Sequence, residues 1–187
     1  GCARTANNEV HCWGDRTRRN QPQSINAPPP PKTIVLGRDV SQLDANGPML
    51  CMLRRGEVDC SGGDVQIWID DGVRGGTPVV SLKDASFVQV VVGWAHACGR
   101  RRNGTIGCWG YNHGGQLGSG PPLDDKPRET VVPVKLASAI DVAARENTTC
   151  AVLRNGTVSC WGTNRDGQVG NGTFGNVYTV GAPVEAP

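Results

Sequence analysis

Eight cysteines are the residues of this chain with the clearest chemical potential, because thiols either form disulfides or bind soft metal ions. They fall into four close pairs: Cys2 and Cys12, Cys51 and Cys60, Cys98 and Cys108, and Cys150 and Cys160. Cysteines nine or ten positions apart do not have zinc-site spacing, and only His11, His96 and His113 are available as histidine ligands. The spacing therefore favours four disulfides over a metal site, and we expect no cofactor.

Candidates for acid–base or nucleophilic chemistry are few. His96 stands two positions before Cys98, and a lone histidine in a strand is more often a hydrogen-bonded packing residue than a general base. Asp70 and Asp71 are paired carboxylates, but they precede Gly72 in a turn pattern and have no histidine or nucleophile nearby in sequence. We therefore predict no catalytic site, with a hydrolase that uses His96 as the alternative.

Two arginine clusters could bind a partner. One comprises Arg16, Arg18 and Arg19, and the other comprises Arg100, Arg101 and Arg102. No aromatic residues are interleaved with these arginines, and the formal net charge of +2 is too small to indicate nucleic acid by itself. We expect exposed loop tips with a possible role in partner binding, and no nucleic-acid partner.

Four asparagines satisfy the glycosylation acceptor pattern: Asn103, Asn147, Asn155 and Asn171. Three of them stand in Asn-Gly-Thr, which is also a turn pattern, so the turn explains their presence without a glycan. Asn147 lies outside a hairpin tip and is the more informative of the four. All four are candidate glycosylation sites in a eukaryotic secretory pathway.

The elements that must position the paired cysteines are short β-hairpins. Between Cys150 and Cys160, two β-prone runs flank Asn155 and Gly156, which is a strong hairpin signal. A three-residue loop with Gly156 in the left-handed region places the two cysteines directly opposite each other, within disulfide range. The hairpin register therefore predicts the disulfide, which should stabilise the fold by about 2.5–3 kcal/mol.

The other three pairs fit the same scheme. The first and third pairs have the same spacing, with Asn8 and Gly104 in the left-handed position. The second pair is one residue closer, so it needs a two-residue turn at Arg55 and Gly56, with positive φ at Arg55. We therefore expect four local disulfides.

The cysteine pairs also mark an internal repeat, because the first cysteine of each pair recurs at intervals of 49, 47 and 52 residues. A helical array would show apolar positions at a period of about 3.6 residues, and this chain does not. We therefore expect an all-β chain that forms a single domain over residues 1–187. Its repeat units are 1–50, 51–97, 98–149 and 150–187.

The residues after each second cysteine carry a resemblance to a known family. Trp-Gly follows at 13–14, 109–110 and 161–162, and the last two units continue to Gly-Gln-Leu-Gly (115–118) and Gly-Gln-Val-Gly (167–170). This pattern resembles the regulator of chromosome condensation repeat. The resemblance implies four β-propeller blades, out of the seven of a closed propeller of that family. Units one and two depart from the pattern, and Ser61 replaces the tryptophan in unit two.

Four units are fewer than a closed ring of this family needs, and both ends of the chain look cut within a unit. We therefore expect a fragment of a larger ectodomain, or a half propeller that completes itself with a second copy. A closed four-bladed ring is a third option.

Four disulfides indicate an oxidising compartment, so we expect a secreted or cell-surface protein without membrane insertion. The leading hypothesis is a noncatalytic recognition or scaffold module that binds a protein or glycan through loops 14–33, 61–77 and 120–130. The resemblance offers two precedents, the ectodomains of plant receptor kinases and a secreted bacterial enzyme inhibitor. The alternatives are such an inhibitor, a nuclear propeller for guanine-nucleotide exchange and chromatin binding, and a hydrolase that uses the central channel.

Overall fold

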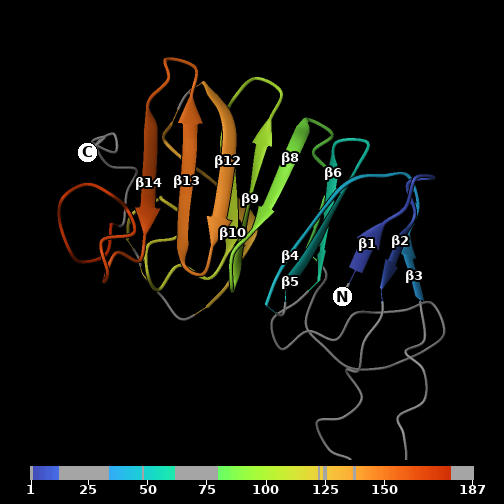
Figure 1. Ribbon diagram of the computed structural model, residues 1–187, viewed down its shortest axis with the longest axis horizontal. Coiled ribbons are helices and arrows are strands. Elements are labelled where there is room, and N and C mark those ends of the chain that lie inside the picture. The colour runs from blue at the N-terminus through green and yellow to red at the C-terminus, as the bar shows by residue number, and fades with distance from the viewer. Residues whose placement is uncertain are drawn as a thin grey trace, which may run out of the picture.

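The computed structural model shows strands and turns, and no helix, in the residues that it describes, which are 2–12, 34–47, 49–61, 80–121, 123, 126–136 and 138–177. The strands form four separate antiparallel sheets (Figure 1). The predicted all-β fold is therefore confirmed. Several sequence candidates lie outside the described residues: Arg16, Arg18, Arg19, Asp70, Asp71, the loop 14–33 and nearly all of 61–77.

We call the four sheets blades 1 to 4 in chain order. Blade 1 consists of β1 (Cys2–Arg4), β2 (Val10–Cys12) and β3 (Ile34–Gly37). Blade 2 consists of β4 (Val40–Asn46), β5 (Met49–Arg54), β6 (Glu57–Ser61) and β7 (Val80–Leu82). Blade 3 consists of β8 (Phe87–Val92), β9 (His96–Arg101), β10 (Ile106–Gly110) and β11 (Arg128–Pro133). Blade 4 consists of β12 (Ala139–Arg145), β13 (Thr148–Leu153) and β14 (Val158–Gly162), and one further bridge pairs Gly162 with Val177.

Strand order across each sheet follows chain order, so the strand that precedes the first cysteine of a pair is the inner strand of blades 2 to 4. These inner strands are β4, β8 and β12. In blade 1, β1 is the edge strand, and no described residue pairs with its inner side. Blades 2 to 4 therefore each start one strand before the corresponding predicted repeat unit, and the division into units remains a prediction.

All four expected disulfides are present, and each joins two directly opposed residues of the central hairpin of its blade. The turns have the expected conformations. Positive φ occurs at Asn8 (64°), Arg55 (51°), Gly56 (86°), Gly104 (85°) and Gly156 (86°). The hairpin register derived from the cysteine spacing is therefore confirmed, including the shorter turn of the second pair.

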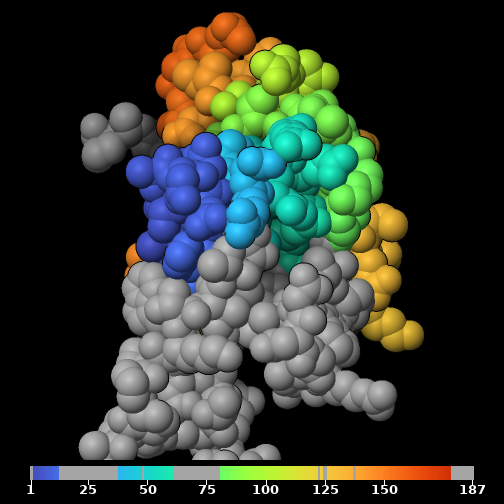
Figure 2. All heavy atoms as spheres, turned by 90° about the vertical axis from the view of Figure 1, so that its right-hand side faces the viewer, coloured from blue at the N-terminus to red at the C-terminus, as the bar shows by residue number. Residues whose placement is uncertain are grey.

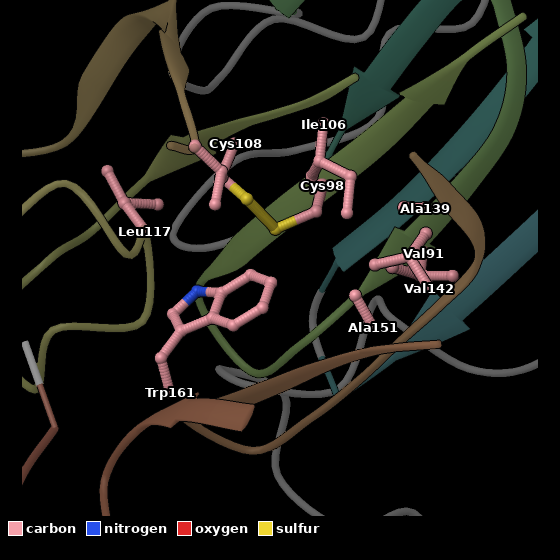
Figure 3. Packing of buried hydrophobic residues seen from close by; sticks show 10 residues of the cluster. Val91, Cys98, Ile106, Cys108, Leu117, Ala139, Val142, Ala151 and Trp161 are labelled. Atoms are coloured by element: carbon pink, nitrogen blue, oxygen red, sulfur yellow. A yellow bond between two sulfur atoms is a disulfide. The ribbon is translucent and has the colours of Figure 1, made fainter. Parts of the chain in front are cut away.

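The blades stack face to face in chain order, as the colours in Figure 2 show. A disulfide of one blade and the inner strand of the next meet at each boundary. Between blades 3 and 4, the Cys98–Cys108 disulfide lies over the ring of Trp161 (Figure 3). Between blades 2 and 3, Trp109 takes the equivalent place and makes an edge contact with Phe87 at 6.1 Å between ring centroids.

The boundary between blades 1 and 2 has a smaller core because Ser61, and not tryptophan, follows the second cysteine of blade 2. Its buried members are Val10, Cys12, Val40 and Leu50. This boundary therefore buries no large aromatic side chain among the described residues.

One backbone hydrogen bond recurs at every boundary. The residue in the left-handed position of each hairpin turn accepts from the first inner-strand residue of the next blade. The pairs are Val40 to Asn8 (3.0 Å), Phe87 to Gly56 (3.2 Å) and Ala139 to Gly104 (3.0 Å). The same bond therefore sets the position of blades 2, 3 and 4 relative to the blade before each.

The stack has two distinct ends. We call one the hairpin end, which carries the turns that join the two disulfide-linked strands, such as 102–104 and 154–156. We call the other the loop end, which carries the turns at Gly47, 93–95 and 146–147 and the segments that follow β10 and β14.

Candidate functional site

His96 joins blade 3 to blade 4 and is fully buried. Its Nε2 lies 2.8 Å from the hydroxyl of Thr149 on β13, and its Nδ1 has no hydrogen-bond partner among the described residues. Burial, with a smaller effect from His113, lowers the pKa of His96 from 6.5 to about 3. His96 is therefore a buried, hydrogen-bonded residue between two sheets, and its noncatalytic role stays a prediction.

Gln116 is the centre of the contact between the two blades. Its backbone carbonyl accepts hydrogen bonds from the Thr149 hydroxyl at 3.1 Å and from the Trp161 indole at 3.0 Å. Its side-chain oxygen accepts from the backbone N–H of Gly114 at 2.8 Å. The loop that leaves blade 3 is therefore attached to two strands of blade 4.

The glycine two positions after Gln116 permits this close approach. A methyl group at Gly118 would lie 2.7 Å from the Trp161 indole nitrogen, and the φ of Gly118 is +67°. No other residue type fits this position without a shift of the loop or of Trp161. The Gly-Gln-Leu-Gly motif is therefore a packing element of the boundary.

Trp109 shows what happens where the motif is absent. Its indole nitrogen is buried and has no hydrogen-bond partner among the described residues, in contrast to that of Trp161. The blade before Trp109 is blade 2, whose sequence lacks Gly-Gln-Leu-Gly after Cys60. Unit two therefore lacks the sequence motif whose Gln116 carbonyl accepts from the Trp161 indole at the next boundary.

The four candidate glycosylation sites fall into two structural groups. In three of them the asparagine side-chain oxygen accepts from both the N–H and the hydroxyl of the threonine two residues later; these are Asn103, Asn155 and Asn171. Asn147 was expected outside a hairpin tip, but it lies in the two-residue turn between the paired strands β12 and β13. It is half-buried at the loop end, and its side-chain oxygen accepts from Gln116 at 3.3 Å. The sequon that the sequence marked as most informative thus belongs to the blade boundary.

The arginine cluster 100–102 is largely used inside blade 3. The Arg101 side chain is 21% exposed, donates to Asp84 at 2.6 Å and lies 4.6 Å from the Phe87 ring centroid. Arg100 donates to Gln89 at 3.0 Å. Arg102 remains exposed at the hairpin tip, so it is the member of the cluster best placed to meet a partner.

A cavity of about 270 Å³ opens at the hairpin end beside blade 2, lined by Arg38, Asp39, Arg54, Arg55 and Glu57. Each of its arginines has a carboxylate partner: Arg38 contacts Glu9, Arg54 contacts Asp59 and Arg55 contacts Asp39. Because these charges are paired within the chain, the cavity is a poor site for an anionic ligand.

Three exposed large apolar side chains lie in separate segments at the loop end. The four in the described residues are Trp94, Leu123, Ile140 and Phe174, and all except Ile140 lie in segments that connect strands there. Trp94 is 49% exposed, and its backbone N–H donates to Glu146 of blade 4 at 2.7 Å. Its ring packs on the backbone of Gly47 of blade 2, where an added methyl group would lie 2.7 Å from the ring. Trp94 is thus exposed on one side and held by both neighbouring blades.

Sequence reasoning did not identify Trp94, because a tryptophan in an apolar run indicates core. The signal that could have found it is its position between Gly93 and Ala95, at the turn from the inner strand to the disulfide-bearing strand. Across the described residues, no three histidine, cysteine or acidic side chains come together as metal ligands, and there is no helix able to span a membrane.

The chain matches the family described as regulator of chromosome condensation (RCC1) repeat at residues 87–116 and 139–168. It is 32% identical to human "Probable E3 ubiquitin-protein ligase HERC3" over 96 residues, which are 50% of this chain and 9% of that protein. It is also 32% identical to the mouse "Secretion-regulating guanine nucleotide exchange factor" over 121 residues, which cover 56% of this chain and 26% of that protein. The chain thus spans a small part of these relatives.

Solved structures resemble the fold at lower identity. Prp20p from Saccharomyces cerevisiae, whose structure was described with its binding to Gsp1p and histones, matches with a TM-score of 0.68 at 16% identity, over 96% of this chain and 47% of that one. The ectodomain of the Physcomitrella patens receptor kinase CR4 matches with a TM-score of 0.50 at 21% identity, over 88% of this chain and 39% of that one. These matches show that the four sheets have the fold of β-propeller blades.

Proposed function

Because this chain carries repeats of the regulator of chromosome condensation family, we propose that it is a noncatalytic module that binds a protein partner through its loop end. The observation that carries the proposal is the position of Trp94, Leu123 and Phe174 at that end. Large aromatic side chains held rigidly at a surface are typical centres of protein–protein interfaces, since little side-chain entropy is lost on binding.

The setting that we propose is extracellular or at the cell surface. Eight cysteines in four disulfides support it, since reducing compartments keep thiols free. The likeness to a receptor-kinase ectodomain is compatible with this setting. Candidate glycans at Asn103 and Asn155 would lie at the hairpin end, and Arg102 could contribute there to a secondary contact.

Photo-crosslinking in the cells that produce the protein tests the proposed face. A photoreactive amino acid replaces Trp94 in one variant and Arg102, at the opposite end, in another. We expect a discrete crosslinked protein from position 94 and not from position 102. Crosslinks from position 102 alone, or from neither position, would contradict the proposal.

Affinity measurements with the crosslinked partner then test the side chains. We expect Trp94→Ala to weaken binding at least tenfold, because loss of a central aromatic anchor typically costs more than about 1.4 kcal/mol. Ile140→Ala is the matched control, because Ile140 has a similar exposed fraction (46%) but lies on β12 near the hairpin end. Equal effects of the two substitutions would argue against a loop-end interface.

Guanine-nucleotide exchange is the second candidate, supported by the mouse relative named as an exchange factor. Nucleotide release from a panel of small GTPases separates the two functions. We expect the oxidised protein to leave the release rates unchanged, and catalysed release would replace our proposal with the exchange function.

A further inference from the structure

Four asparagines of this chain are followed directly by glycine: Asn46, Asn103, Asn155 and Asn171. In such a pair, the backbone nitrogen of the glycine can attack the side-chain carbonyl carbon of the asparagine, because glycine has no side chain to hinder the approach. The ring that forms is a succinimide, and its hydrolysis leaves aspartate or isoaspartate. Each pair is therefore a candidate for deamidation, and the fold decides which of them reacts.

Three of the four pairs have the same local sequence and the same side-chain hydrogen bonds. Each is Asn-Gly-Thr, and the asparagine Oδ1 accepts from the threonine N–H at 3.0–3.1 Å and from the threonine hydroxyl at 2.8 Å. These pairs begin at Asn103, Asn155 and Asn171. Local sequence therefore does not separate them, and a difference in rate must come from the rest of the fold.

The attacking nitrogen is held by a hydrogen bond at two of these three sites. The N–H of Gly104 donates to the carbonyl of Arg101 at 2.9 Å. The N–H of Gly156 donates to the carbonyl of Leu153, also at 2.9 Å. Both bonds lie in turns that join disulfide-linked strands. Ring closure would break the bond and rotate the backbone of the turn, so each hairpin slows the reaction.

Asn46 is held in a different way. It pairs with Met49 across the β4–β5 ladder. The ring of Trp94 packs on the backbone of Gly47, where a methyl group would lie 2.7 Å from the ring. Ring closure rotates the backbone of the asparagine, which the ladder opposes. Three of the four pairs are therefore restrained.

The fourth pair, Asn171 and Gly172, lacks these restraints. Gly172 is exposed, and its N–H has no hydrogen-bond partner among the described residues. A methyl group at Gly172 would meet nothing within 4 Å, so its surroundings are open to solvent. The pair lies between β14 and Val177, outside every strand of the described part of the chain. Asn171 thus combines a free attacking nitrogen with a backbone that no ladder holds.

The carbonyl that is attacked is also surrounded by hydrogen-bond donors. Besides the two donors of Thr173, Asn171 Oδ1 accepts from Nδ2 of Asn164 at 3.4 Å. Asn164 is fully buried and fixed, because it also donates to the carbonyl of Thr173 at 2.8 Å and accepts from the N–H of Val169 at 2.9 Å. Negative charge develops on the Asn171 oxygen during the attack, so these donors stabilise the tetrahedral intermediate.

We propose that Asn171 is the deamidation site of the folded protein, with Thr173 and Asn164 stabilising the attacked oxygen. The Gly172 nitrogen gives its proton to hydroxide or a buffer base and bonds to the side-chain carbon of Asn171. The carbon–nitrogen bond of the side-chain amide then breaks, and this nitrogen takes a proton from solvent and leaves as ammonia. Water adds to either ring carbonyl and opens the succinimide. The net reaction consumes one water, releases one ammonia and replaces a neutral amide by a carboxylate.

This change falls in the loop that carries Phe174, whose side chain is 80% exposed. Isoaspartate adds a carbon to the backbone directly before the point at which Asn164 holds Thr173. Deamidation therefore lengthens and charges the segment that presents Phe174. The modification itself does not depend on the function proposed for the loop end.

Timed incubation of the oxidised protein at mildly alkaline pH tests the assignment, with protein produced in the bacterial periplasm so that the asparagines carry no glycan. Peptide mass spectrometry measures amide loss at each site, and an isoaspartate methyltransferase identifies the product. We expect Asn171 to react about tenfold faster than Asn103 and Asn155, because the turn bonds at those sites must break first. In the reduced, denatured chain the three sites should react at similar rates, since all are Asn-Gly-Thr.

Substitutions test the donors around Asn171. Thr173→Val removes the hydroxyl but keeps the size of the side chain, and we expect it to slow the reaction at Asn171 about fivefold. Thr157→Val is the matched control, because it removes the same contact from Asn155 and should leave the rate at Asn171 unchanged. Asn171→Ser reproduces Ser119 at the equivalent position of the third repeat unit, and it should abolish the acidic form that ion exchange separates.

Three results would overturn the proposal. One is an equal rate at Asn171 and Asn155 in the folded protein. Another is no amide loss at Asn171 under conditions in which the denatured chain reacts there. The third is a rate at Asn171 that Thr173→Val leaves unchanged or raises.

Discussion

Trp161 donates its indole N–H to the backbone carbonyl of Gln116 at 3.0 Å, across the boundary between blades 3 and 4. The equivalent tryptophan of blade 3 is equally buried but has no such partner among the described residues. Two residues of the same type in the same repeat position therefore differ by one hydrogen bond.

This difference predicts unequal effects of one substitution. Trp161→Phe and Trp109→Phe remove the same atoms from equivalent cores, but only the first removes a hydrogen bond to a described residue. We expect Trp161→Phe to lower the free energy of unfolding by about 1 kcal/mol more than Trp109→Phe. Urea unfolding of both variants without reductant measures this, and equal losses would show that the indole hydrogen bond contributes nothing.

Gly118 should tolerate a methyl group poorly. Gly118→Ala combines strain at positive φ with a 2.7 Å approach to the Trp161 indole, and we expect a loss of about 2–4 kcal/mol. Gly156→Ala is the control, because its φ is also positive (+86°) but nothing lies within 4 Å. Gly156→Ala should lower the free energy of unfolding only by the backbone strain, about 1–2 kcal/mol. Thermal unfolding compares the two, and a smaller loss at Gly118 would contradict the packing argument.

Acid should destabilise the protein through His96. The pKa of His96 is lowered to about 3 in the folded state, whereas an unfolded histidine titrates near 6.5. The unfolded state therefore takes up a proton first as the pH falls, and stability is lost from about pH 6.5 down toward pH 3. The loss should approach about 1.4 kcal/mol per pH unit below pH 6.

The carboxylates change the stability of the protein at lower pH than His96 does. Burial raises the pKa of Asp59, but hydrogen bonds from Ser81 and Arg54 outweigh it, and the net pKa is lowered. Stability from such a group is lost only below its unfolded pKa, near pH 4. The interval from pH 6.5 to 4.5 therefore lies above the pH at which Asp59 contributes. His96→Gln should reduce the slope of the unfolding free energy against pH in this interval, measured by urea unfolding. An unchanged slope in this variant would assign the pH dependence to other groups.

The Cys98–Cys108 and Cys150–Cys160 disulfides should contribute unequally to the free energy of unfolding, although they close loops of the same length. The chain-entropy part is about 2.5–3 kcal/mol for each. Cys98 and Cys108 are also fully buried beneath the next blade, whereas Cys150 is partly exposed, so alanine pairs leave a larger void at the first site. We expect replacement of Cys98 and Cys108 by alanine to lower the free energy of unfolding by about 1 kcal/mol more than replacement of Cys150 and Cys160. Denaturant unfolding measures both. The reverse order would contradict the burial argument.

Much of the fold followed from local chemistry in the sequence. The Asn-Gly turns and the cysteine spacing determine the hairpin register, since a hairpin loop of known length fixes which residues oppose each other. Arg55 shows the strength of this argument, because the spacing required positive φ at an arginine and the structure has it at 51°.

The contacts between blades could not be predicted in the same way. They join residues far apart in the chain, such as His96 with Thr149, whose pairing depends on how the sheets stack. The exposure of Trp94 depends on the neighbouring turns at Gly47 and Glu146, whose positions its local sequence does not specify. The local sequence pattern thus predicts each sheet, but which side chains stay exposed is determined only when the sheets pack against one another.

Every sulfur crosslink closes within its own sheet, so only a single strand of polypeptide links each sheet covalently to the next. Under mechanical tension, the sheets would detach one after another while each hairpin stayed locked. The length gained when each sheet unfolds would not include the residues enclosed by its disulfide. Such a molecule would lengthen in discrete steps, and its reach under load would depend on the redox state of its surroundings.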